Sequence, residues 1–277
     1  FVIPFSLLKP SNAPLRGFAI SRFFRLYPAY WVSMILAVAI IPLLREETFT
    51  LTQIVANTTM LQQFLGQKNI LGVYWTLQIE IVFYVVSAML FYVRLLHKPE
   101  GAVGAVVFFL ICALAMSAAR YSLNMKLPVA IPLGLTVMFW GLLWRHALSD
   151  QGDLRLRRLV VYTSLFVVAG LPLVSLLSYN TDMGFGETWY RYTIAYYSGM
   201  ALFALLTTKL RITNPVFVWL GAISYSVYLL GPVAQPVVEY FLPYQLLAPY
   251  PVHIIVVLAW ALTIAMAYLS YRFVGLP

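Results

Sequence analysis

The sequence predicts an all-α protein, a polytopic bundle of transmembrane helices. Hydrophobic residues make up 62% of its 277 residues, whereas a soluble globular domain is about 45–50% apolar. The mean hydropathy is +0.85. Charged residues make up only 10% of the chain, too few to coat a water-soluble surface of this size. The apolar surface is therefore expected to face lipid, and residues 1–277 are expected to form a single transmembrane domain.

Eight stretches are long enough to cross a bilayer, which takes about 20 residues in a helix. Each is longer than a barrel strand and lacks dyad alternation, so helices are the expected form. The expected spans are roughly 27–44, 73–93, 101–119, 127–144, 159–178, 192–208, 212–238 and 254–271. Residues 1–8 are too few to span and are expected to be the tail of another helix. Segments 45–72 and 145–158 are expected to be the largest exposed loops.

The loop charges predict the orientation of these spans. Of the 18 Lys and Arg residues, five fall on one side of the expected spans: Arg45, Lys68, Arg120, Lys126 and Arg191. The others fall on the opposite side, which the positive-inside rule makes cytoplasmic. Both ends of the chain are therefore expected in the cytoplasm. The net charge of +9 follows from this bias, and no nucleic-acid partner is expected.

A metal site is not expected. The chain has a single cysteine, Cys112, and three histidines, His97, His146 and His253. No two of them have the spacing of metal ligands. The histidines fall in loops or at span ends, so none is expected beside a buried carboxylate.

Two arginines precede the first complete span. Arg22 and Arg25 are three residues apart and share one face of a helix. Two adjacent guanidinium groups can bind phosphate oxygens in a forked geometry. The alternative is that both only anchor the helix among lipid headgroups.

Glu80 is the one carboxylate in the middle of an expected span. A charge at this depth costs roughly 2.5 kcal/mol or more, so Glu80 is expected to face the bundle interior. Thr76 and Tyr84 recur at four-residue intervals around it and give this helix one polar face. Glu80 is interpreted as part of a site wall, as a carboxylate that orients an Arg or His, or as a structural interhelical hydrogen bond. Trp75 begins the same segment.

A late span carries a polar cluster made of Ser224, Tyr225 and Tyr228. Tyr225 and Tyr228 lie one turn apart, and small residues around them allow close helix packing. The cluster is interpreted either as part of a site wall or as packing with hydrogen bonds.

Three stretches resemble the acyltransferase-3 family of integral membrane O-acyltransferases. FVIPFSL at 1–7, continuing to RFFRLYPAYW at 22–31, is similar to the end of the family's second helix and the Arg-x-x-Arg start of its third. YWTLQIEIVFY at 74–84 is similar to the family's Trp…Glu helix, and ISYSVYL at 223–229 to its late Ser-Tyr-x-x-Tyr-Leu helix. The resemblance implies a ten-helix core that lacks its first helix and most of its second.

The resemblance also implies a reaction. Such a protein transfers an acyl group, usually acetyl, from cytoplasmic acyl-CoA to a hydroxyl of a glycan or lipid-linked sugar, as in polysaccharide modification by O-acetylation. Arg22 and Arg25 would bind acyl-CoA, Glu80 would support catalysis, and Trp75, Tyr84, Ser224, Tyr225 and Tyr228 would line the site. The expected location is the inner (plasma) membrane of a bacterium.

Two positions depart from the family pattern. Gly231 stands where the late helix often has a histidine, and Gly275 stands where the end of the chain often has a glutamate. The family's catalytic histidine lies in the first helix, so the 277-residue chain is expected to be inactive by itself. The rival functions are a transporter of a lipid-linked sugar or small solute and a non-catalytic relative of the enzymes.

Overall fold

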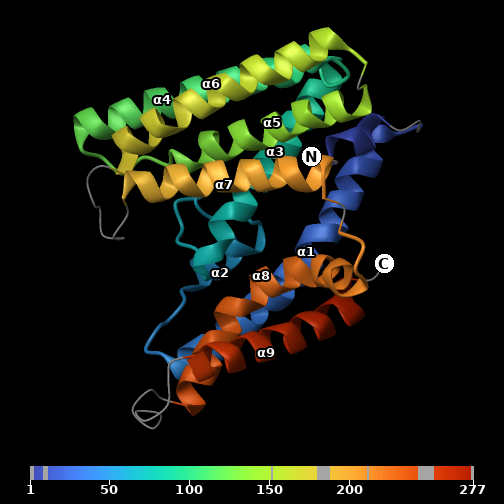
Figure 1. Ribbon diagram of the computed structural model, residues 1–277. Coiled ribbons are helices and arrows are strands. Elements are labelled where there is room, and N and C mark those ends of the chain that lie inside the picture. Colours follow the sequence, from blue (N-terminus) through green and yellow to red (C-terminus); the bar gives the residue numbers. More distant parts are fainter. Residues whose placement is uncertain are drawn as a thin grey trace. The chain divides into compact units, whose positions relative to one another are not determined.

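The computed structural model describes residues 3–8, 12–150, 152–179, 188–210, 212–242 and 253–275, and these contain helices and no strand (Figure 1). The all-α prediction is confirmed. The elements in chain order are a 3-10 helix (Pro4–Leu8), α1 (Pro14–Leu44), α2 (Leu51–Thr58), a 3-10 turn (Gly72–Tyr74), α3 (Trp75–Tyr92), α4 (Pro99–Leu123), α5 (Ala130–Ser149), α6 (Leu154–Tyr179), α7 (Trp189–Thr208), α8 (Pro215–Phe241), α9 (His253–Ser270) and a π-helical end (Tyr271–Gly275).

Helix α7 differs from the other long helices. Within the described ranges, seven helices are long and apolar enough to cross a membrane: α1, α3, α4, α5, α6, α8 and α9. The predicted span 192–208 does form a helix, α7, but it is not among these seven. Its first half is rich in tyrosine and contains Arg191, which lowers its mean hydropathy. The prediction of about eight spans is thus confirmed for seven.

The segments expected to be exposed loops are smaller or more buried than predicted. Helix α5 runs to Ser149 and α6 begins at Leu154, so most of 145–158 is helical. In 45–72, Asn57, Met60 and Gln62 are fully buried. The expectation of exposure is wrong for these three residues, because α2 and the turn after it fold back onto α1, whereas half of the segment is exposed. At the start of the chain, the expected helix tail is a 3-10 helix.

The chain forms two compact units. The α4–α7 unit consists of Phe1–Leu15 and Ile81–Arg211, and the α1–α8–α9 unit consists of Arg16–Glu80 and Ile212–Pro277. The boundary falls inside α3, whose first turns belong to the second of these units.

Aromatic side chains contribute to the core of the α4–α7 unit, beside aliphatic ones such as Leu133 and Val167. Helix α4 packs against α5 and α6, and α7 packs against α6 (Figure 1). The Phe109 and Phe139 rings stack with centroids 5.8 Å apart, and Phe83 lies 4.9 Å from Phe139. Gly170 allows α6 to approach α4, because a Cβ there would lie 2.8 Å from a methyl of Leu110. Shape complementarity therefore fixes these helices relative to one another.

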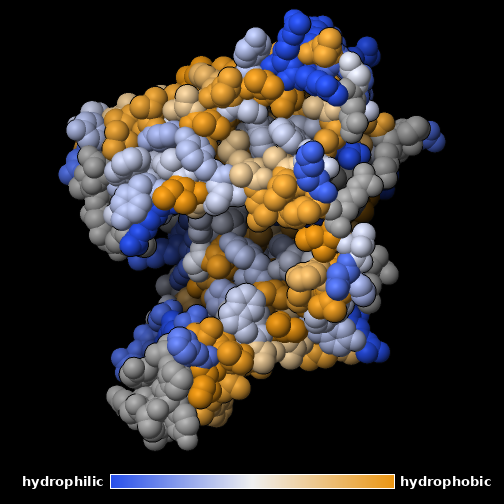
Figure 2. Space-filling model, viewed as in Figure 1, coloured by the Kyte–Doolittle hydropathy of each residue, from blue (hydrophilic) through white to orange (hydrophobic). Residues whose placement is uncertain are grey.

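Helices α8 and α9 lie side by side in the α1–α8–α9 unit (Figure 1). Helix α8 begins with a capped turn, in which the Asn214 side chain accepts a hydrogen bond from the Val216 N–H at 2.9 Å. Helix α9 leaves apolar side chains exposed, with Val257 64% and Trp260 58% accessible. Apolar side chains also cover much of the face shown in Figure 2. Such exposure suits a surface that meets lipid.

Candidate functional site

The first and third motif stretches lie against each other in the α1–α8–α9 unit. The Tyr225 hydroxyl of α8 donates a hydrogen bond to the Leu26 carbonyl of α1 at 2.9 Å. Two turns further along α1, the Ser33 hydroxyl donates to the Leu229 carbonyl at 2.9 Å. From the first contact to the second, the residue number increases in both helices, from 26 to 33 in α1 and from 225 to 229 in α8. Helices α1 and α8 therefore run parallel in this region.

The second motif stretch joins the same contact through Tyr74. Its hydroxyl lies 2.9 Å from the Ser33 hydroxyl, and both side chains are fully buried. Because Ser33 gives its single proton to the Leu229 carbonyl, Tyr74 is the donor in this pair. Tyr30 packs on Tyr74 with ring centroids 4.5 Å apart. One buried serine, two residues beyond the first motif stretch, thus connects α1 with the second and third motif stretches.

Tyr228 forms a second contact with the start of α3. Its hydroxyl lies 2.6 Å from that of Thr76 and 2.9 Å from the Val73 carbonyl. Of the three polar side chains predicted on α8, Tyr225 and Tyr228 therefore both reach the other motif stretches. Ser224 does not, because it is exposed and its hydroxyl bonds to the Gly221 carbonyl at 2.8 Å.

Arg22 and Arg25 both lie in α1, as predicted, and their surroundings differ. Arg22 is partly buried, with its guanidinium carbon 5.6 Å from the centre of the Phe18 ring. Arg25 is exposed and makes no hydrogen bond or ion pair with the residues that the structure describes. Arg25 directly precedes Leu26, whose carbonyl accepts the hydrogen bond from Tyr225. A cationic pair is therefore positioned one turn from the three-motif contact.

Helix α3 carries the remaining predicted residues. Thr76, Glu80 and Tyr84 follow one another at four-residue intervals within it, as the sequence predicts. Trp75 is 40% exposed, Glu80 is partly buried and Tyr84 is buried. Tyr84 falls in the α4–α7 unit, so of this set Trp75, Thr76 and Glu80 share a unit with the arginines.

Sequence reasoning did not single out Gln78, between Thr76 and Glu80. Gln78 is fully buried, and neither its amide oxygen nor its amide nitrogen has a hydrogen-bond partner among the described residues. A buried amide without partners costs about 1–3 kcal/mol. Such a group calls for an explanation, and a role in a functional site is one. Its only sequence signal is an amide within an apolar span.

The tyrosines of the first motif bind the segment that follows α1. Tyr30 donates to the Asn57 carbonyl at 2.6 Å, and Trp31 donates to the Thr58 carbonyl at 3.0 Å. The Tyr27 hydroxyl donates to the next carbonyl, that of Thr59, at 3.0 Å. Residues 57–59 thereby lie against the middle of α1, although the chain has left the end of this helix at Leu44. Sequence reasoning missed this role for the motif aromatics.

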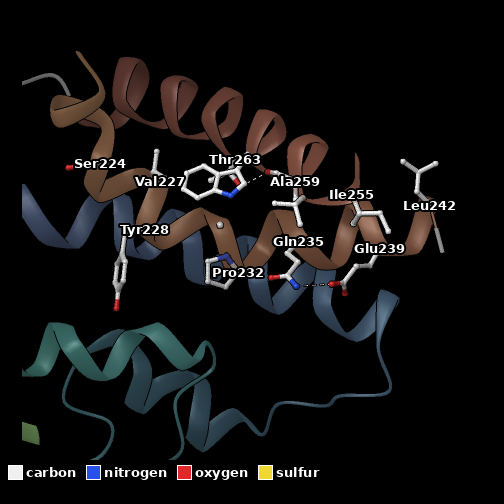
Figure 3. Close-up of a pocket in the computed structure, with 13 residues that line it drawn as sticks. Ser224, Val227, Tyr228, Pro232, Gln235, Glu239, Leu242, Ile255, Ala259 and Thr263 are labelled. Atoms are coloured by element: carbon white, nitrogen blue, oxygen red, sulfur yellow. Dashed lines mark hydrogen bonds between the residues drawn. The ribbon is translucent and has the colours of Figure 1, made fainter. Parts of the chain in front are cut away.

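A groove of about 990 Å³ lies between α8 and α9 within the same unit (Figure 3). This volume is at the upper end of the range for small-molecule sites, about 300–1,000 Å³. Ser224 and Tyr228 lie toward one end of the groove and Glu239 toward the other. Gly231 lines its middle, and a Cβ built there would lie 3.7 Å from the Thr263 methyl. The glycine that departs from the family pattern thus faces this groove.

Within the described residues, seven helices are long and apolar enough to cross a membrane, which marks the chain as an integral membrane protein. The chain belongs to the acyltransferase-3 family: the family model described as an acyltransferase domain matches residues 1–270. No curated protein and no solved structure matches the chain. The family makes the protein a membrane acyltransferase.

Proposed function

We propose that this membrane acyltransferase moves an acyl group, acetyl in the first instance, from cytoplasmic acyl-CoA to a hydroxyl of a glycan or lipid-linked sugar. The observation that carries the proposal is the contact of the three motif stretches around Ser33 and Tyr225, next to Arg22 and Arg25. The family supports acyl transfer, and the arginines support a phosphate-bearing donor.

The arginines suit the phosphates of CoA. Arg25 is exposed and has no hydrogen bond or ion pair to a described residue, so phosphate binding would not have to break an existing ion pair. Guanidinium groups bind phosphate oxygens in bidentate geometry more strongly than neutral donors do. In the proposed binding mode they hold the phosphates at the membrane surface.

The reaction needs a base and an environment that protects the thioester. The base removes the proton of the acceptor hydroxyl, and the hydroxyl oxygen attacks the thioester carbonyl. The carbon–sulfur bond breaks, an ester forms and the CoA thiolate leaves with the proton. The family's catalytic histidine would be that base. Glu80 is proposed to support it by stabilising the positive charge that the base acquires.

Single arginine variants of the full-length protein test this function. Arg22→Ala and Arg25→Ala are expected to weaken acyl-CoA binding and lower transfer of labelled acetyl to extracted glycan about tenfold or more each, the loss of one charge-assisted contact of about 1.5–3 kcal/mol. Arg16→Ala is the matched control, because Arg16 is exposed on the same helix and carries the same charge. It is expected to behave as the wild type.

Unchanged binding and transfer in Arg22→Ala and Arg25→Ala would remove the proposed role of these arginines.

A transporter is distinguished from the enzyme because its activity does not require acyl-CoA. Proteoliposomes that take up a lipid-linked sugar or small solute without acyl-CoA, and transfer no label, would contradict the enzyme proposal. A non-catalytic relative would show neither uptake nor label transfer.

A further inference from the structure

The groove between α8 and α9 has the length of a lipid chain. Ser224 and Glu239 line it at positions fifteen residues apart in α8, which corresponds to about 22 Å along the helix axis. The hydrocarbon core of a bilayer is about 30 Å thick. The groove is therefore long enough for one lipid chain, which in a bilayer crosses about half of this thickness.

The central part of the groove is lined mainly by apolar groups, together with the indole of Trp260. The Thr263 hydroxyl donates to the Ala259 carbonyl at 2.7 Å, which leaves its methyl group toward Gly231. Pro232 has no backbone N–H to offer. The Ser224 hydroxyl is likewise bonded to its own helix. An occupant of this stretch gains by burying hydrocarbon, at about 25 cal/mol per Å².

Polar groups with remaining hydrogen-bonding capacity gather at the other end. The Gln235 amide donates to one carboxylate oxygen of Glu239 at 2.7 Å (Figure 3). Arg45 donates to the other carboxylate oxygen at 3.0 Å. The Gln235 amide oxygen accepts no hydrogen bond from a described residue. Arg45 and Glu239 are partly exposed, with side-chain accessibilities of 46% and 41%, so both can still contact a ligand.

The charges at this end select against an anionic head group. Arg45 and Glu239 neutralise each other, so the cluster has no excess positive charge to attract a phosphate. The Glu239 carboxylate would repel a phosphate placed beside it. A carboxylate, an amide and a guanidinium together both accept and donate hydrogen bonds. Neutral hydroxyl groups match this combination because each both donates and accepts.

We propose that the groove binds a neutral glycolipid, with one alkyl chain along α8 and α9 and sugar hydroxyls against Gln235, Glu239 and Arg45. We also assign this lipid as the acyl acceptor, and this assignment rests on the proposed function. The proposal that the groove binds the lipid does not rest on it. Binding is measured without acyl-CoA, so it can fail while acyl transfer is retained, and the reverse.

Photolabelling of the full-length protein in nanodiscs tests the site. The probe is a monoglucosyl diacylglycerol with a diazirine in one acyl chain, and the comparison probe is a phosphatidylglycerol with the same chain. Mass spectrometry is expected to place the glucolipid label on residues 224–242 and 253–263. Glucolipid labelling is expected to exceed that by phosphatidylglycerol at least about fivefold, the equivalent of one net hydrogen bond.

Two variants separate groove binding from general contact with lipid. Ala259→Trp fills the groove and is expected to reduce glucolipid labelling about fivefold or more. Val257→Trp is the control, because Val257 lies on the same helix, is 64% exposed and does not line the groove. It is expected to leave labelling unchanged. A thermal unfolding scan checks that both variants fold, and Gly231→Leu replaces Ala259→Trp if the latter does not.

The head-group contacts are tested by Gln235→Ala and Glu239→Ala. Gln235→Ala is expected to bring the ratio of glucolipid to phosphatidylglycerol labelling close to one. Glu239→Ala is expected to bring it to one or below, because it also leaves the Arg45 charge without its partner. Equal labelling of the wild type by both probes would overturn the proposal, because the groove would then hold bulk lipid. Labelling that avoids residues 224–242 and 253–263, or that persists in the groove-filled variant, would overturn it as well.

Discussion

Tyr225 donates its hydroxyl proton to the backbone carbonyl of Leu26, across a separation of 199 residues in the sequence. The bond attaches α8 to the turn of α1 that immediately follows Arg25. A tyrosine that belongs to the late motif thereby helps to position the arginines of the early motif. The two motifs are therefore in contact in the fold although they are far apart in the sequence.

Removing the Tyr225 hydroxyl is expected to lower the stability of the fold modestly and the affinity for acyl-CoA more clearly. Tyr225→Phe loses one hydrogen bond, worth about 1 kcal/mol, and allows the turn at Arg25 to shift. The measurements are thermal unfolding in detergent and acyl-CoA affinity. Tyr240→Phe is the control, because Tyr240 is 57% exposed on the same helix and has no hydrogen bond among the described residues. Equal behaviour of the two variants would refute a positioning role.

The buried pair Ser33 and Tyr74 is expected to show strong coupling. Ser33→Ala leaves the fully buried Tyr74 hydroxyl without its acceptor, which costs about 1–3 kcal/mol. Tyr74→Phe removes that hydroxyl, so the double variant is expected to be less destabilised than the sum of the single variants. A double-mutant cycle measures the difference, expected to be about 1 kcal/mol. Additive losses would show that the two hydroxyls do not depend on each other.

Gln78 is expected to contribute to function and not to stability. Gln78→Met removes an amide without partners among the described residues and replaces it with an apolar side chain of similar length. Thermal stability is therefore expected to hold or rise. Acyl transfer is expected to fall. Gln62→Met is the comparison, because Gln62 is equally buried and donates to Asn69 at 2.6 Å. That variant is expected to lose about 1 kcal/mol of stability. A destabilised Gln78→Met would mean that the amide is structural.

Two glycines of α4 are expected to respond oppositely to alanine. A Cβ at Gly101 would collide with the backbone carbonyl of Leu95, whereas a Cβ at Gly104 meets nothing within 4 Å. Gly101→Ala is therefore expected to cost about 1–3 kcal/mol, and the loss shows as a lower unfolding temperature. Gly104→Ala is expected to be neutral or to stabilise by up to about 1 kcal/mol, the helix propensity difference. Matching unfolding temperatures would exclude the collision.

Much of the fold follows from the sequence because the bilayer permits few backbone structures. A run such as 101–119 has to form a helix in lipid, since each backbone N–H and C=O needs a partner within the segment. The structure forms α4 there, and the other seven predicted spans are helical as well. The loop prediction for 45–72 missed α2 and the buried Asn57, Met60 and Gln62, because periodicity carries no information on a segment that returns to pack on α1.

For the candidate site too, some features follow from the sequence and others depend on the tertiary structure. Sequence patterns alone determine that Arg22 and Arg25 share α1, that Thr76, Glu80 and Tyr84 share a face of α3, and that the motifs resemble one family. Only the tertiary structure decides that Tyr225 reaches Leu26 while its neighbour Ser224 bonds to its own helix. It also decides that Gly231 faces a groove and that Gln78 is buried without a described partner. The physical reason is that helix formation depends on residues three or four apart, whereas these contacts depend on how helices from distant parts of the chain pack together.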